Sequence, residues 1–223
     1  MIPADKQHIM GNGETNEDAQ LPEFNLFNVL EVWQQERAQS EFLAWLMDPA
    51  SSHGLGNAFL RVFIRHVVAE AHVLYEDGTL VSQPPAEETV AGWLLSDAEV
   101  ETEWRFIDII GADGTDKVVW FVENKVFSGE HSNQLSRYLE IVESEYAGFT
   151  ILPVFLTIRA LYPQSPDNKQ KYIPIGYDEI ADLVERTRED NPGMDTGIAF
   201  FLSQYTRALR KYMLQEEDGN RRT

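Results

Sequence analysis

Residues 104–138 read WRFIDIIGADGTDKVVWFVENKVFSGEHSNQLSRY, and this stretch decides the fold. Two apolar runs rich in β-branched and aromatic residues, at 104–110 and 118–126, flank the turn-forming segment GADGTD. Two such runs around a glycine-containing turn predict a β-hairpin. Both sets of alternating positions in each run are largely apolar, which is typical of strands in a sheet that is covered on both faces.

Three charged residues, Asp108, Glu123 and Lys125, interrupt this apolar pattern. A carboxylate on a covered sheet is costly unless it is paired, hydrogen-bonded or bound to a metal. One interpretation is a structural ion pair between Lys125 and one of the carboxylates. The other is a site for a hard divalent cation, which prefers oxygen ligands, with the lysine positioning or deprotonating a water beside it.

The expected register of the hairpin separates these two interpretations. A turn centred near Gly114 would place Asp108 opposite Trp120, about three residues short of Glu123 at ~3.3 Å per residue. The metal interpretation therefore predicts a bend or bulge that closes the gap. The ion-pair interpretation needs no such distortion.

The spacing D-x14-E-x-K, formed by Asp108, Glu123 and Lys125, resembles the core motif of the PD-(D/E)xK nuclease superfamily. Upstream, residues 36–63 (ERAQSEFLAWLMDPASSHGLGNAFLRVF) resemble the N-terminal helices of uncharacterised bacterial members. The whole resemblance spans roughly residues 25–185. It is specific at the level of the superfamily and does not identify a substrate.

A second motif follows the lysine. Gln134 and Tyr138 form a Q-x-x-x-Y pair on one face of an expected helix, and this pair resembles the additional motif of the exonuclease-like branch. The resemblance implies that the two side chains steady Lys125 or a phosphate. The alternative is a solvated glutamine and a half-buried tyrosine without a role in the site.

The resemblance implies a metal-dependent phosphodiesterase that acts on DNA, in defence or DNA processing. Asp108 and Glu123 would hold Mg²⁺ or Mn²⁺ with help from the backbone carbonyl of Asn124, and Lys125 would orient the hydrolytic water. Related nucleases often supply a further carboxylate from an N-terminal helix, and Glu36 is the position that fits. The alternative for Glu36 is an ordinary exposed helix glutamate.

The remaining pattern predicts an α/β fold. The nearly continuous apolar run at 149–158 predicts a buried strand, and YIPIGY at 172–177 predicts a short edge strand because Pro174 cannot donate to a ladder. We expect a mixed central sheet of about four to five strands flanked by helices on both faces. The resemblance implies the same restriction-endonuclease-like core.

The chain of 223 residues is long enough for one substantial core. Residues 1–22 are polar and turn-rich and predict a flexible lead-in. Residues 23–223 are expected to form a single nuclease domain with an irregular insertion near 76–97, which carries Pro84 and Pro85.

Composition excludes several classes of site. The chain has no cysteine, so it has no disulfide framework and no thiolate nucleophile or metal ligand. Neither a signal-peptide core nor an apolar run of ~18 residues is present in the sequence. We expect a cytoplasmic protein without a membrane partner, and the oligomeric state stays open. Two histidines, His53 in a loop and His66 on a helix surface, are not expected to be ligands.

The net charge argues against a generally DNA-binding surface. The chain has 37 acidic and 18 basic residues, a formal net charge of −19, whereas binding of the phosphate backbone depends mainly on lysine and arginine. Three explanations stay open: basic residues focused into a local groove, a basic partner protein that supplies the grip on DNA, or a fold that has lost cleavage. The alternative function is a non-enzymatic acidic interaction module or DNA mimic on a degenerate nuclease fold. A third reading makes the three charged residues a buried ion network.

Overall fold

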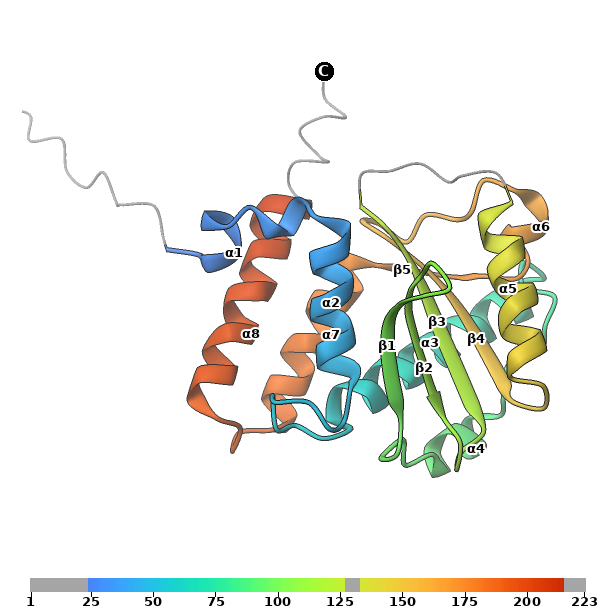
Figure 1. The fold of residues 1–223 in the computed structure, drawn as a ribbon, viewed down its shortest axis with the longest axis horizontal. Coiled ribbons are helices and arrows are strands. Elements are labelled where there is room, and N and C mark those ends of the chain that lie inside the picture. Colours follow the sequence, from blue (N-terminus) through green and yellow to red (C-terminus); the bar gives the residue numbers. More distant parts are fainter. Residues whose placement is uncertain (1–23, 127–132, 215–223) are drawn as a thin grey trace, which may run out of the picture.

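Residues 24–126 and 133–214 are described by a computed structural model of the protein, so the lead-in expected at 1–22 lies outside the described part. A five-stranded sheet with the order β1-β2-β3-β4-β5 forms its centre (Figure 1). The strands are β1 (Glu99–Trp104), β2 (Ile107–Asp113), β3 (Val118–Lys125), β4 (Thr150–Thr157) and β5 (Ile173–Gly176). β1, β2 and β3 pair antiparallel, whereas β3, β4 and β5 pair parallel. The predicted mixed sheet is confirmed, with β5 at one edge.

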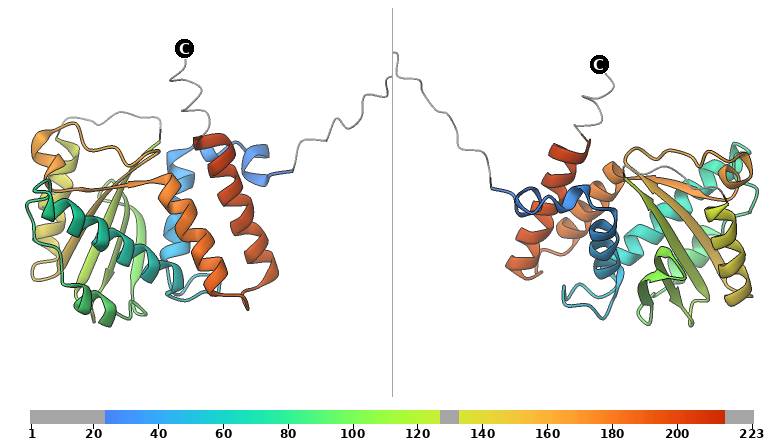
Figure 2. Two further views of the ribbon diagram at one scale, coloured as in Figure 1. Left: turned by 180° about the vertical axis from the view of Figure 1, so that it is seen from behind. Right: turned by 45° about the horizontal axis from the view of Figure 1, so that its top comes forward.

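Helices cover both faces of this sheet, as the sequence predicts. They are α1 (Leu26–Val29), α2 (Glu36–Met47), α3 (Ala58–Glu76), α4 (Glu87–Gly92), α5 (Gln134–Glu145), α6 (Pro166–Lys169), α7 (Tyr177–Asp190) and α8 (Thr196–Ala208), with short turns η1 (Val32–Gln34) and η2 (Leu209–Met213). α5 lies on one face. α3 crosses the opposite face, with α2 and α7 beside it and α8 outermost (Figure 1, Figure 2).

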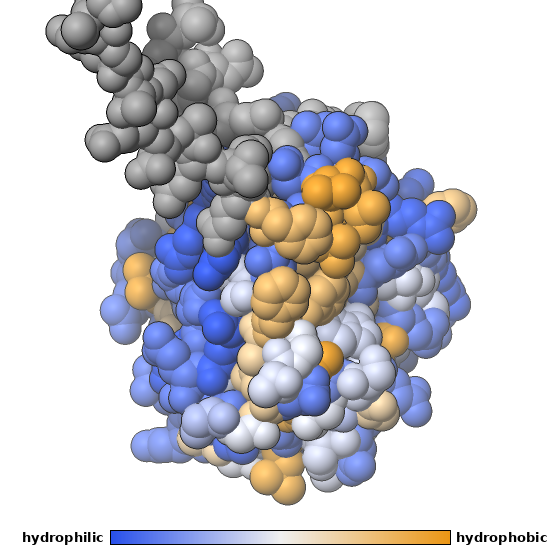
Figure 3. Space-filling view, turned by 90° about the vertical axis from the view of Figure 1, so that its left-hand side faces the viewer, coloured by the Kyte–Doolittle hydropathy of each residue, from blue (hydrophilic) through white to orange (hydrophobic). Residues whose placement is uncertain are grey.

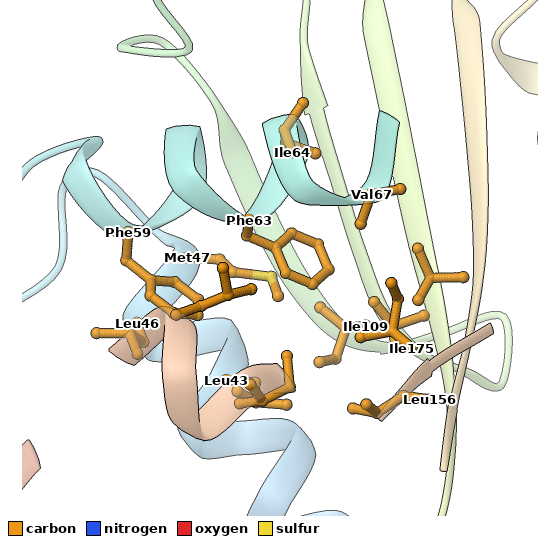
Figure 4. Close-up of a cluster of buried hydrophobic side chains, with 14 of the residues drawn as sticks. Leu43, Leu46, Met47, Phe59, Phe63, Ile64, Val67, Ile109, Leu156 and Ile175 are labelled. Atoms are coloured by element: carbon orange, nitrogen blue, oxygen red, sulfur yellow. The ribbon is translucent and has the colours of Figure 1, made fainter. Parts of the chain in front are cut away.

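The larger core lies between α2, α3, α7 and one face of the sheet. Figure 4 shows Met47 of α2 and Phe63 of α3 facing Ile109, Leu156 and Ile175 from three different strands. All five side chains are almost completely buried. Burying side chains of this size stabilises the fold by roughly 1.5–3 kcal/mol each, so this core fixes α2 and α3 against the strands.

The smaller core lies on the other face, under α5. Leu135 and Val142 of this helix pack against Val119 and Phe121 of β3 and Phe155 of β4. Leu135 and Val142 fall on the same stripe of the helix, which is the spacing of an amphipathic helix that covers a sheet. α5 is therefore anchored over the strands that carry the charged residues.

The turn between β2 and β3 lies further along the chain than the sequence indicates. Asp113 pairs with Val118, so the turn is centred between Thr115 and Asp116. The side chain of Asp113 fixes this position, because its Oδ1 accepts the backbone N–H groups of Thr115 and Asp116 at 2.9 Å each. The expectation that the turn is centred at Gly114 is therefore wrong, because these two hydrogen bonds place the turn later in the chain.

Gly111 adds a second constraint on this register. It lies opposite Trp120 in the ladder, and a Cβ atom at position 111 would lie 2.2 Å from Cζ2 of the indole. Only glycine leaves room for that ring. A one-residue slip would place a side chain there, so the pair pins β2 against β3.

The expected strand at 104–110 is two strands. Arg105 and Phe106 form a tight turn between β1 and β2, with φ of 50° and 72°, and Trp104 pairs with Ile107 across it. Strict alternation does not hold at the start of β2, because Ile107 packs in the smaller core whereas Ile109, two residues later, packs in the larger one. Phe106 therefore lies in a turn and not in a strand, although the sequence predicts one strand over 104–110.

The insertion expected near 76–97 contains a helix. α3 ends at Glu76, and α4 follows within the segment before β1 begins at Glu99. The division into a lead-in and a single domain stays a prediction. No helix among residues 24–126 and 133–214 is long and apolar enough to cross a membrane.

Apolar side chains are exposed on the side where α1 and α8 lie, and Figure 3 shows them as a band on this face. Phe24, Val29, Leu30 and Phe200 are between 56 % and 63 % exposed. Phe200 is thus an exposed phenylalanine on a helix that does not pack on the sheet.

Candidate active site

Asp108 and Glu123 both lie just beyond the end of the ladder between β2 and β3. The last pair of the ladder is Ile109 with Val122, so one further step in the same register would place Asp108 opposite Glu123. Beyond this pair, Asp108 Oδ2 accepts the backbone N–H of Asn124 at 2.7 Å. The expected three-residue gap is wrong because the turn lies later in the chain. The metal interpretation therefore needs no bulge to bring the two carboxylates together.

Glu123 is completely buried, and Lys125 is its partner. Lys125 Nζ lies 2.7 Å from Glu123 Oε1, and the lysine side chain is only 12 % exposed. This contact has the distance of an ion pair, but no donor among the described residues is aligned for a hydrogen bond to either Glu123 oxygen. A buried carboxylate whose second oxygen has no donor is costly. Glu123 therefore has the capacity to accept a further cationic partner.

Burial dominates the electrostatics of the two carboxylates. It raises the pKa of Asp108 to about 6, although the Asn124 N–H and the charge of Lys125 oppose the shift. Burial, followed by the charge of Asp108, raises the pKa of Glu123 to about 7. Like charges and a low dielectric both disfavour two ionised carboxylates here. A divalent cation would remove this penalty.

Lys125 stays charged in this setting. Burial opposes its charge, but the contact with Glu123 and the charges of Asp108 and Glu36 outweigh burial and raise the pKa of Lys125. The ammonium group is therefore protonated at neutral pH. It can donate hydrogen bonds to a water or to a phosphate oxygen, and it supplies one positive charge beside two carboxylates.

Glu36 reaches the same end of β3 from α2. It is the first residue of that helix, and its Oε1 accepts the backbone N–H of Val126 at 2.8 Å. Its charge also acts on both Asp108 and Glu123. The three carboxylates do not converge within 4.8 Å of one another among the described residues. Glu36 lies beside the site, with one oxygen engaged by the backbone.

The Asn124 side chain points to the opposite face. Its Nδ2 donates to the Glu36 carbonyl and to Ser40 Oγ, both at 3.1 Å, and its Oδ1 accepts the hydroxyl of Tyr177 at 3.0 Å. Asn124 is 1 % exposed, so this network fastens β3 to α2 and α7. The ligand role of its backbone carbonyl stays a prediction. Tyr177 was missed, because no local pattern links residues 53 positions apart.

Gln134 and Tyr138 contact each other, as their spacing predicts. Gln134 Nε2 donates to the Tyr138 hydroxyl at 2.9 Å, and that hydroxyl donates to the carbonyl of Phe106. Tyr138 is 1 % exposed, so the half-buried alternative is wrong. The described hydrogen bonds of the pair lead to the turn before Asp108 and not to Lys125. This contact gives the Q-x-x-x-Y pair a positioning role.

The histidines lie outside this constellation. His53 is 2 % exposed and hydrogen-bonds locally to the Asp48 carbonyl and the Leu55 N–H. His66 is partly buried between α3 and α7, where its Nε2 lies 2.8 Å from Glu179 Oε1. With Glu70, these two residues form the one group of three metal-capable side chains within 4.8 Å in the described ranges. The ion pair with Glu179 accounts for the position of His66.

One known protein family matches this chain. A family model described as the PD-(D/E)XK nuclease superfamily matches residues 24–207. This range includes all the candidate site residues described above. No curated protein and no solved structure matches the chain.

Proposed function

The chain belongs to the PD-(D/E)XK nuclease superfamily, and from this premise we propose that it is a metal-dependent phosphodiesterase that cleaves DNA. The observation that supports the proposal is the closeness of Asp108 and Glu123, whose charges act on each other, beside Lys125. One buried and one half-buried carboxylate, both with raised pKa values, and one adjacent cation form a charge arrangement that a structural ion pair does not need. It suits a site that binds a divalent metal and a phosphate together.

The donor set fits Mg²⁺ or Mn²⁺. Glu123 Oε2 is buried and has no donor among the described residues, and Asp108 keeps one oxygen beyond the one that the Asn124 N–H occupies. Asp108 and Glu123 would hold the metal, with the Asn124 carbonyl and Glu36 as further oxygen donors. When bound, the metal supplies Lewis acidity and lowers the pKa of a coordinated water.

The protein groups would then position the reacting atoms. Lys125, protonated and fixed by Glu123, would donate to the attacking water or to a phosphate oxygen and stabilise the negative charge that develops there. Asn124 holds the carboxylates in place indirectly, because its side chain ties this end of β3 to α2 and α7. Gln134 and Tyr138 would fix the turn that leads into Asp108.

Basic residues border this end of the sheet despite the net charge. Arg37 follows Glu36 in the first turn of α2, Arg105 lies in the turn before Asp108, and Arg137 lies in the first turn of α5. Arg37 and Arg105 are 76 % and 50 % exposed. Arg37 and Arg105 are each ion-paired, with Glu41 and Glu145 respectively, so they add little uncompensated positive charge. A basic partner protein therefore stays among the explanations for how the chain would hold DNA.

The test is cleavage of end-labelled single-stranded and double-stranded DNA with Mg²⁺ or Mn²⁺ and with chelator. Wild type should cut only with metal. Asp108→Asn should abolish cutting, and Lys125→Met should slow it by about 10²–10³-fold, the usual cost of losing one electrostatic donor. Cleavage that survives Asp108→Asn, or that needs no metal, would contradict the proposal.

The net charge of −19 supports the second candidate, an acidic interaction module. That function predicts salt-sensitive binding to a basic protein which is unchanged in Asp108→Asn and independent of metal. Wild type that cleaves no DNA but shows this binding would favour the module over the nuclease.

A further inference from the structure

Phe106 occupies a position that the fold alone does not explain. It is the second residue of the two-residue turn between β1 and β2, with φ of 72°, and its side chain is 77 % exposed. Turns with positive φ at both central residues strongly favour Asn and Gly, and a bulky residue there is a steric outlier. Both the backbone conformation and the exposed ring cost stability. Such outliers point to a functional constraint.

The turn is held firmly on both of its residues. The carbonyl of Phe106 accepts the hydroxyl of Tyr138, which is buried under α5. Arg105 Nη2 lies 2.6 Å from Glu145 Oε1 at the end of the same helix, and its guanidinium stacks over Trp104 at 4.9 Å. The ring of Phe106 is therefore presented from a fixed backbone, which lowers the entropic cost of binding a ligand.

The turn also places Phe106 at the border of the candidate site. Asp108 follows two residues later, so the two Cα atoms lie at most about 7 Å apart. Glu103, next to this turn, acts electrostatically on Asp108. An exposed aromatic ring at this distance from the expected phosphate position is within reach of the base of the same or a neighbouring nucleotide.

We infer that Phe106 is a stacking platform for an unpaired nucleobase of the substrate, an inference that rests on the proposed nuclease function. Stacking uses the π-face that every base carries and needs no positive charge. It would let a chain of net charge −19 hold DNA with few cations. A base must leave a duplex stack before it can lie on the ring, so the substrate class is single-stranded DNA or a frayed end.

The test compares Phe106→Leu with the matched change Phe200→Leu. Both replace an exposed phenylalanine, but Phe200 lies on α8 away from the site strands. The full-length proteins are titrated, in chelator to prevent cleavage, into a short single-stranded oligonucleotide that carries 2-aminopurine, and into its duplex. Stacking should quench the fluorescence of the base in wild type and in Phe200→Leu.

Phe106→Leu should lose the quenching and weaken single-strand binding by about 5- to 150-fold, the range that corresponds to one stacked base. Phe106→Trp should retain both properties. Duplex binding should be equal in all variants, and the unfolding midpoint of Phe106→Leu should match wild type because the ring is exposed. The inference would be overturned if both leucine variants bound single strands equally well, or if Phe106→Leu lost as much affinity for the duplex as for the single strand. Metal-dependent cleavage by wild type would still uphold the nuclease function in that case. Wild type that neither binds nor cleaves DNA would overturn both.

Discussion

The hydroxyl of Tyr138 donates to the backbone carbonyl of Phe106, and so a helix on one face of the sheet fixes the turn that leads into Asp108. Gln134 completes the arrangement by donating to the same hydroxyl at 2.9 Å. A buried hydroxyl with two partners is a stable anchor. The Q-x-x-x-Y pair thereby gains a physical role in placing a carboxylate of the site.

Tyr138→Phe removes the hydroxyl and keeps the ring. The Phe106 carbonyl and the Gln134 amide lose a partner, so the free energy of unfolding should fall by about 1–3 kcal/mol and cleavage should slow. Tyr172→Phe is the matched control, because Tyr172 is also buried and donates to a carbonyl of the same helix, that of Leu135. Denaturant unfolding and cleavage rates are measured for both. A similar loss of cleavage in the two variants would show that Tyr138 acts only through stability.

Asn124→Asp tests the network behind the site. The new carboxylate cannot donate to the Glu36 carbonyl, which now accepts from Asn124 Nδ2 at 3.1 Å, and a buried charge is added next to two acids. We expect the free energy of unfolding to fall by about 3 kcal/mol or more at pH 8. Denaturant titration measures it. Wild-type stability in this variant would mean that the network does not hold β3 to α2 and α7.

The raised carboxyl pKa values predict how metal-free stability depends on pH. Because the folded pKa values, about 6 for Asp108 and about 7 for Glu123, exceed the ordinary ones, the native state binds more protons than the unfolded state. This contribution to stability is complete below about pH 4 and is lost as pH rises through 6 to 7. In chelator, Asp108→Asn should therefore be more stable than wild type at pH 8 by about 1–3 kcal/mol. A loss of about 3–5 kcal/mol there would instead identify a structural ion network.

The contact between His66 and Glu179, which joins α3 to α7, predicts a second pH dependence of stability that is independent of the candidate site. The hydrogen bond that His66 donates to the Glu179 carboxylate outweighs burial and raises the pKa of His66. A raised histidine pKa stabilises the fold fully below about pH 6.5 and loses this effect as pH rises through the folded value. His66→Asn should therefore destabilise more at pH 6 than at pH 9 in thermal unfolding. An equal loss at both values would mean that the pair contributes nothing through charge.

The sequence indicated which charged residues would come together better than it indicated their register. Asp108, Glu123 and Lys125 stand out because charges are rare on covered strands. The register did not follow from the glycine in the turn, because the side chain of Asp113 determines which residues form it. The network around Asn124 depends on Tyr177, and contacts between residues so far apart need the tertiary fold.

The sequence of β1 also has the alternation that is typical of a strand with one covered face. EVETEW alternates acids with Val100, Thr102 and Trp104, and the structure alternates exposed and partly buried residues along this strand in the same way. The turn after it was hidden because Arg105 and Phe106 are not turn-forming residues. The same departure from turn chemistry is the observation behind the stacking role that we infer for Phe106.

Thermal unfolding with Mg²⁺, with Mn²⁺ and with chelator tests the central claim, a metal site at Asp108 and Glu123, most directly. Wild type, Asp108→Asn and His66→Asn are compared, because the group of His66, Glu70 and Glu179 is the competing place for a metal. Binding to the folded state alone stabilises it by about 2.7 kcal/mol at a metal concentration 100 times the Kd. Metal should raise the midpoint of wild type and of His66→Asn, and it should leave Asp108→Asn unchanged. A rise that persists in Asp108→Asn, or no rise in wild type, would contradict the claim.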